Sequence, residues 1–118
     1  MAQDFKKLRV WQAAKDFTID IYKVTEKFPV SEQYAMVQQL RRAAYSVPSN
    51  IAEGCGKTSQ KELARYLSIS NGSIKEVENF LILAKELGYL SKQDYSVLSE
   101  NLEKIAKMNS RLLKNVRD

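Results

Sequence analysis

The residues of this 118-residue sequence whose types and spacing point to a chemistry are its lysines and arginines. One row of cations falls within about 80° of a helical wheel near the end of the sequence, with Arg117 beside it. This row comprises Lys104, Lys107, Arg111 and Lys114. A looser row comprises Lys61, Arg65 and Lys75. Rows of this kind can neutralise the phosphates of a nucleic acid and release its counterions.

The same rows also fit an ordinary solvated helix surface. Lysines are common on the outside of helices, and Glu100 and Glu103 dilute the first row at its start. The net charge of +5 permits nucleic-acid binding without requiring it. The sequence has no recognition helix, zinc ligands or aromatic–basic RNA motif, so any binding should be directed at the backbone and weakly sequence-specific.

Enzymatic catalysis is not expected. The sequence contains no histidine, which excludes Ser–His and Cys–His sites, histidine-dependent nucleases and Glu-x-x-His di-iron bundles. No pair of carboxylates stands out on an apolar helix face. The single cysteine, Cys55, has no base or second metal ligand near it in sequence, so we interpret it as a packing residue. No cofactor or metal is predicted.

The length predicts one domain, residues 1–118, which can bury roughly two-thirds of its unfolded surface. Hydrophobic residues make up 44% and charged residues 28%, as in globular proteins in water. We expect no signal peptide and no membrane helix, because no apolar run approaches about 20 residues. A lone cysteine fits a reducing cytoplasm, which is the predicted location.

Apolar residues spaced by three and four predict an all-α protein, an up-down-up-down antiparallel four-helix bundle with short loops. The second helix is predicted to be kinked at Pro48. Capping boxes at Ser59 and Ser91 mark the starts of the third and fourth helices. The expected helices run from about Leu8 to Lys27, from Ser31 or Glu32 to Gly54, from Ser59 to about Leu87, and onward from Ser91.

The stretch 40–54 organises the bundle. Its buried face is expected to be continuous across Pro48, because Ile51 keeps the helical phase of Leu40 and Ala44. The alternative is a helix that ends at Ser46, since helices often stop before proline.

Glycines near this stretch and further on carry separate expectations. Gly54 and Gly56 are expected to stop the second helix through left-handed geometry. Gly72 is expected to allow the close approach of another backbone, because glycine inside a helix costs about 1 kcal/mol relative to alanine. Asn109, at a core position of the last helix, is expected to fix register.

A second apolar group on the first helix lies well away from its core seam. It comprises Leu8, Trp11, Ile19 and Tyr22. A bundle helix needs only one buried stripe, so either an N-terminal arm or loop covers this group, or it forms a subunit interface.

Several stretches together resemble the bacterial family of 23S rRNA intervening-sequence proteins. They are Leu-Arg-Arg-Ala-Ala at 40–44, Ser-Val-Pro-Ser-Asn-Ile-Ala-Glu-Gly at 46–54, Val10-Trp11, Phe28-Pro29, Gly72-Ser73 and Gly88-Tyr89-Leu90. A more distant resemblance is to the accessory variability determinant of diversity-generating retroelements. The motif residues carried over are Arg41, Arg42, Pro48, Ser49, Asn50, Glu53 and Gly54.

The resemblance implies a homo-oligomer, most often a pentameric ring with a basic surface, and it favours the interface interpretation of the second apolar group. It also implies RNA or DNA as a partner, RNA being favoured, and a reverse transcriptase or another protein as a further one. A protein-binding scaffold with incidental charge is the alternative.

Within the motif, Arg41 is expected to pair with Glu76 or Glu78 on a neighbouring helix. Arg42 is expected to project outward with Ser49 and Glu53.

Overall fold

Four long helices make up the computed structural model, which describes residues 4–117 and, of residue 117, only the backbone. A short 3₁₀ turn at Phe5–Lys7 precedes the first helix, and a 3₁₀ turn at Val30–Glu32 followed by a π turn at Gln33–Val37 leads into the second. The helices are α1 (Arg9–Thr25), α2 (Gln38–Cys55), α3 (Gln60–Glu86) and α4 (Lys92–Arg117). The prediction of an all-α four-helix bundle is confirmed, and no strand occurs in residues 4–117.

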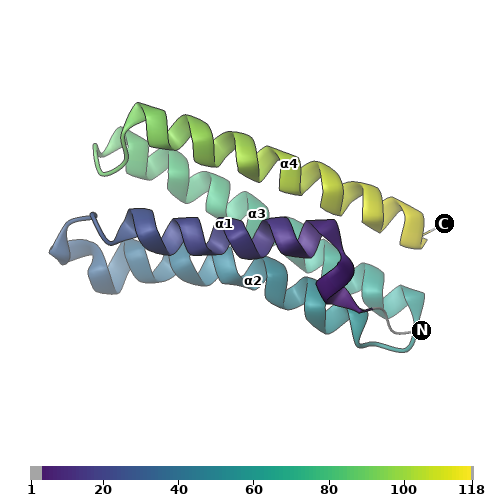
Figure 1. The fold of residues 1–118 in the computed structure, drawn as a ribbon. Coiled ribbons are helices and arrows are strands. Elements are labelled where there is room, and N and C mark those ends of the chain that lie inside the picture. Colours follow the sequence, from purple (N-terminus) through teal and green to yellow (C-terminus); the bar gives the residue numbers. More distant parts are fainter. Residues whose placement is uncertain (1–3, 118) are drawn as a thin grey trace.

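Consecutive helices run in opposite directions. Thr25 and Thr18 of α1 contact Arg41 and Ala44 of α2, so the sequence numbers descend on one helix as they rise on the other. The N-terminus, the C-terminus and the α2–α3 turn therefore lie at one end of the bundle, and the other two connections lie at the opposite end (Figure 1). The bundle measures 44 × 24 × 20 Å.

The predicted helix boundaries are right to within a few residues except at the start of the second helix. There the Glu32 carboxylate accepts a hydrogen bond from the Met36 backbone amide at 3.3 Å and another from the Tyr89 hydroxyl at 3.0 Å. These contacts hold the π turn, so regular α2 begins only at Gln38. The first helix also ends earlier than expected, at Thr25.

The core follows the predicted seams, which include Val24 in α1 and Leu112 and Val116 in α4, with two shifts. In α1, Thr25 is buried and Val24 is only half-buried. Ile105 and Asn109 are buried as expected, but the next buried residue is Leu113, whereas Leu112 and Val116 are only half-buried. A straight helix has 3.6 residues per turn, so a 4-3 alternation extended too far drifts from the core, and a step of four replaces the expected step of three.

Pro48 lies inside a continuous α2, so the alternative of a helix ending at Ser46 is wrong. The missing proline amide leaves the Ala44 carbonyl without its usual donor four residues later. The Thr18 hydroxyl of α1 lies 3.2 Å from that oxygen and 2.8 Å from the Ala14 carbonyl oxygen, and it donates between them. A side chain of the neighbouring helix thus supplies a hydrogen bond to the Ala44 carbonyl that the proline leaves unpaired. The kink at Pro48 stays a prediction.

The close approach of two backbones occurs at Gly54 and not at Gly72. A Cβ built on Gly54 would lie 2.8 Å from the Cβ of Tyr66, whereas one on Gly72 would meet nothing within 4 Å. The expectation for Gly72 is therefore wrong, because this glycine faces outward. The expectation that Gly54 or Gly56 ends the second helix in a left-handed backbone conformation is wrong too, since α2 continues to Cys55 and Gly56 has a φ of −84°. Positive φ occurs in the described chain at Gly88.

Asn109 is fully buried between α4 and α3. Its Nδ2 donates to the Leu67 carbonyl oxygen at 3.0 Å and to Asn71 Oδ1 at 2.7 Å. Its own Oδ1 has no hydrogen-bond partner among the described residues. The amide therefore links α4 to one place on α3, which agrees with a role in register.

We predict that Thr18→Val lowers the free energy of unfolding by about 1–2 kcal/mol, because it leaves the Ala44 carbonyl without a donor. In a Pro48→Ala background the new amide at position 48 supplies that donor, so the same change should cost less than about 0.5 kcal/mol. Urea denaturation of the four proteins of this double-mutant cycle measures the coupling. Equal costs in both backgrounds would show that Thr18 does not replace the missing donor to the Ala44 carbonyl. A Pro48→Ala protein that does not fold would contradict the helical conformation of this segment.

We also predict that Asn109→Asp destabilises the bundle by about 3 kcal/mol or more at neutral pH. The change replaces two donors by a carboxylate oxygen that faces the Leu67 and Asn71 oxygens in a buried site. Asn115→Asp, on the exposed side of the same helix, is the matched control and should change stability by less than about 0.5 kcal/mol. Similar stability of the two variants in thermal unfolding would show that Asn109 is not buried.

Candidate nucleic-acid interface

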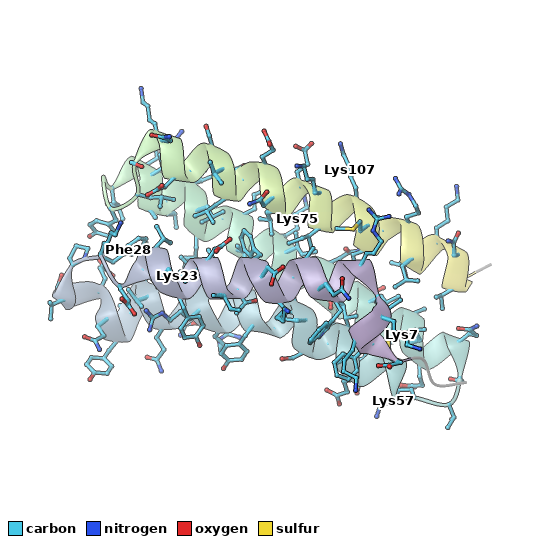
Figure 2. All side chains as sticks on the ribbon, in the orientation of Figure 1. Lys7, Lys23, Phe28, Lys57, Lys75 and Lys107 are labelled. Atoms are coloured by element: carbon cyan, nitrogen blue, oxygen red, sulfur yellow. The ribbon has the colours of Figure 1, made fainter. Side chains whose placement is uncertain are left out.

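The antiparallel topology gathers the cations at one end of the bundle. We call residues 4–14, 50–68 and 105–116 the basic end, because these segments meet where the two termini and the α2–α3 turn lie (Figure 1). The basic end has three acidic residues, and its nine cations are Lys6, Lys7, Arg9, Lys57, Lys61, Arg65, Lys107, Arg111 and Lys114. Figure 2 shows Lys7 and Lys57 near the chain termini and Lys107 on the outer side of α4.

The opposite half, residues 15–49 and 69–104, has nine cations and ten acidic residues. The net positive charge of the described chain therefore lies at the basic end. Exposed large apolar side chains show the reverse distribution, because all ten belong to the opposite half. They are Ile19, Tyr22, Val30, Tyr34, Tyr45, Ile69, Ile82, Leu83, Leu87 and Val97.

The predicted row on α4 is exposed along its whole length, but its members differ in their neighbours. Lys104 Nζ lies 4.0 Å from a Glu100 oxygen and Lys107 Nζ lies 3.8 Å from a Glu103 oxygen. Both pairs are exposed, so their mutual attraction is weak. Within the described residues, Arg111 and Lys114 have no ion-pair partner. Lys104 lies beyond the basic end, so the row is most cationic in its last two turns.

The looser row separates into two parts. Lys61 and Arg65 belong to the basic end, whereas Lys75 lies in the opposite half and pairs with Glu78 at 3.3 Å. Of the three residues, the structure thus brings only Lys61 and Arg65 to the end of α4. The side chain of Arg117 lies outside the described residues.

Two clefts flank the last turns of α4 and carry polar side chains. The cleft between α3 and α4, about 380 Å³, is lined by Gln60, Lys61, Ala64, Arg65, Ser68 and Val116. The cleft between α1 and α4, about 260 Å³, is lined by Leu8, Arg9, Val10, Met108, Arg111, Leu112 and Asn115. Sequence reasoning missed Arg9, although antiparallel pairing of the first and last helices would have placed it beside Arg111.

Lys57 is a further cation that the sequence analysis missed. Its Nζ lies 5.3 Å from the ring centroid of Tyr66, and the guanidinium of Arg65 lies 5.2 Å from the same centroid. Tyr66 packs on Gly54 and is half-buried. The tyrosine therefore positions two of the cations by cation–π attraction.

Arg41 binds α1 and not an acid on α3, so the expected pairing with Glu76 or Glu78 is wrong. Its Nε donates to Thr25 Oγ1 at 2.9 Å and its Nη2 donates to the Tyr22 carbonyl oxygen at 3.1 Å. Its guanidinium also lies 4.5 Å from the Tyr22 ring centroid. Arg41 thus satisfies a carbonyl in the last turn of α1, where positive charge is favoured.

Arg42 is exposed, as expected, and it makes the ion pair with Glu76 that was predicted for Arg41. Its Nη2 donates to the Glu76 carboxylate at 3.1 Å and to Gln39 Oε1 at 3.0 Å. Consecutive helical residues point about 100° apart, so Arg41 turns to α1 and Arg42 turns to α3.

The remaining motif residues divide into buried and exposed groups. Asn50 Nδ2 donates to the Ser46 carbonyl oxygen at 2.8 Å, and Ser46 Oγ lies 2.9 Å from Ser73 Oγ of α3. Pro48 and Gly54 are buried, whereas Ser49 and Glu53 are exposed. Most of the motif therefore attaches α2 to its neighbours.

The four residues of the candidate oligomer interface are not equally accessible. Trp11 is half-buried against Phe5 of the N-terminal 3₁₀ turn, with ring centroids 4.9 Å apart, and Leu8 is half-buried too. Ile19 and Tyr22 remain 47% and 39% exposed, and Tyr45 of α2 is 46% exposed. The N-terminal turn thus covers one part of the group and leaves the other part open.

Other kinds of site find little support in the described part of the chain. No group of three or more cysteine and acidic side chains there is arranged to hold a metal ion. None of the described helices combines the length and apolarity that crossing a membrane requires. Burial raises the pKa of the Cys55 thiol, so the thiolate is disfavoured.

Comparison with known proteins agrees with the four-helix fold. A search of curated proteins gives no match. A crystal structure of a protein of unknown function, from the S23 ribosomal protein family of Bacteroides thetaiotaomicron, superimposes with a TM-score of 0.79. It is 24% identical and covers 89% of this chain and 98% of its own, so it shows the shared fold. The family model of the 23S rRNA-intervening sequence protein matches residues 6–111, and the chain therefore belongs to that family.

Proposed function

We propose that the protein is a non-enzymatic, oligomeric protein that binds nucleic acid, with RNA favoured, through the phosphates that meet its basic end. The observation that carries the proposal is the segregation of charge. The basic end has nine cations and three acidic residues, whereas the opposite half has a net charge close to zero. Positive charge concentrated at one end of the fold raises the electrostatic potential there and attracts polyanions such as nucleic acids.

The chemistry of the basic end fits phosphate contacts and not base reading. Among the described residues, Arg111 and Lys114 have no acidic ion-pair partner to displace, and Arg9 lines the same cleft as Arg111. Each phosphate that such a cation neutralises releases condensed counterions, so affinity should fall steeply as salt rises. Binding should therefore vary little among unrelated sequences.

We predict that the triple variant Lys107→Gln, Arg111→Gln, Lys114→Gln weakens binding to unrelated RNA sequences about equally. It should also flatten the dependence of log affinity on log salt by up to roughly one slope unit per lost contact. Fluorescence anisotropy across a salt series measures both quantities.

The matched control is Lys23→Gln, Lys27→Gln, Lys92→Gln, which removes the same charge from the opposite half. Equal losses in the two triple variants would show that total charge matters and the basic end does not. If the unaltered protein fails to bind RNA or DNA even at low salt, the nucleic-acid function is wrong.

Self-association is the second part of the proposal, and a pentamer is the expected form from the family resemblance. The exposed apolar side chains of the opposite half support it, because Ile19, Tyr22 and Tyr45 lie on the adjoining helices α1 and α2. Apolar and aromatic side chains of this kind are enriched in the centres of subunit interfaces. A ring would repeat the basic end by symmetry, so weak contacts from single subunits would add through avidity.

We predict that Ile19→Glu combined with Tyr45→Glu converts the oligomer to a monomer without unfolding it, because both side chains are nearly half exposed in the single chain. Light scattering gives the mass and circular dichroism gives the helix content. Leu87→Glu, an exposed apolar residue near the α3–α4 turn, serves as the control. A monomeric mass for the unaltered protein at tens of micromolar would refute the assembly.

The alternative is a protein-binding scaffold in the cytoplasm, such as an accessory factor of a reverse transcriptase, whose positive charge is incidental. The ten exposed apolar side chains favour a protein contact of some kind. A protein that is not retained on immobilised RNA even at low salt would favour this alternative over the charge-based proposal.

A further inference from the structure

The shape of the basic end indicates which form of nucleic acid it can bind. The inference below rests on the proposed function and specifies the form of nucleic acid that is the partner. The cations do not form a single line. Arg9 begins α1, Lys61 and Arg65 lie in the first turns of α3, and three cations lie in the last turns of α4, namely Lys107, Arg111 and Lys114. These six cations lie on or beside the last turns of α4, with one polar cleft on each side of that helix. Lys6 and Lys7 belong to the 3₁₀ turn before α1 and Lys57 belongs to the α2–α3 turn, and Figure 2 shows Lys7 and Lys57 on the side of the bundle away from Lys107.

Single-stranded partners require a feature that the basic end lacks. Proteins that bind single strands stack bases on accessible aromatic rings. Phe5 and Trp11 pack against each other, and Tyr66 is half-buried with two cations at its ring. No large apolar side chain is exposed among the described residues of the basic end. Its chemistry is therefore directed at a sugar-phosphate surface and not at unstacked bases.

The width of the basic end distinguishes between the two common duplex forms. Helix α4 is flanked by α1 and α3, whose axes lie about 8–10 Å from its own in a packed bundle. The bundle is 24 × 20 Å across, whereas the major groove of B-form DNA is about 12 Å wide and admits one helix. Neighbouring helices would meet the groove edges before α4 entered. A broad face fits instead the wide, shallow minor groove of an A-form helix, which displays 2′-hydroxyl groups.

The clefts contain groups that can recognise a 2′-hydroxyl. Gln60 and Ser68 line one cleft beside Lys61 and Arg65, and Asn115 lines the other beside Arg111. Amide and hydroxyl side chains can both donate to and accept from a hydroxyl, whereas the neighbouring cations can only donate. We propose that the basic end binds double-stranded RNA across its minor groove, with the cations on phosphates and with Gln60 and Asn115 on 2′-hydroxyl groups.

The test compares three probes of the same mixed sequence: blunt duplex RNA, the corresponding duplex DNA, and one strand of the RNA alone. The full-length protein should bind the RNA duplex about 10-fold or more tightly than either other probe at the same salt concentration. Gln60→Ala combined with Asn115→Ala should weaken binding of duplex RNA by about 3- to 10-fold and leave duplex DNA binding and the salt slope unchanged.

Control variants separate this effect from a general loss of structure or charge. Asn79→Ala combined with Gln93→Ala removes two exposed amides from the opposite half and should leave all three affinities unchanged. Arg111→Gln should weaken the binding of duplex RNA and of duplex DNA by about the same factor. Helix content measured by circular dichroism confirms that each variant is folded.

Every outcome decides the inference. Equal affinity for RNA and DNA duplexes, tighter binding of single strands, or an unaffected Gln60→Ala, Asn115→Ala variant would overturn it while the proposed function stands. Absence of binding to all three probes at low salt would overturn the inference and the proposed function together.

Discussion

The carbonyl groups around Pro48 hold α2 between its two neighbours, and the rest of the bundle depends on this arrangement. The Ala44 carbonyl, freed by the proline, accepts from Thr18 of α1, and the Val47 carbonyl accepts from Ser70 of α3. Arg41 and Arg42 repeat the pattern one turn earlier, toward α1 and α3 respectively. An interior proline normally weakens a helix, because it leaves a buried carbonyl unpaired. Here that carbonyl becomes a point of attachment between helices.

Fixing α2 in this way has a consequence for charge. Because all consecutive helices are antiparallel, the start of α3 lies beside the end of α2, and the end of α4 returns to the start of α1 (Figure 1). Cations that are spread along the sequence from Lys6 to Lys114 then share one end of the molecule. The exposed apolar side chains are left to the other half. One topology thus separates a surface suited to phosphates from a surface suited to protein contacts.

The sequence predicted the architecture well, because long helices with a 4-3 apolar alternation have few other ways to bury their seams. It predicted the cationic row of α4 for the same reason, since residues three and four apart must share a helix face. It failed for Gly54 and Gly72. Both are mid-chain glycines, but only contact with Tyr66 distinguishes the one that allows two backbones to approach.

By itself, then, the sequence determined the helices, their approximate limits and the absence of a histidine-based site, because these depend on composition and on local periodicity. Only the tertiary structure decided which arginine faces which helix, what satisfies the Ala44 carbonyl that Pro48 frees, and that Lys57 packs over Tyr66 at the basic end. Each of these depends on side chains that are distant in sequence. A helical wheel gives the direction in which Arg41 and Arg42 point, but the neighbour that lies in that direction is a property of the packed bundle.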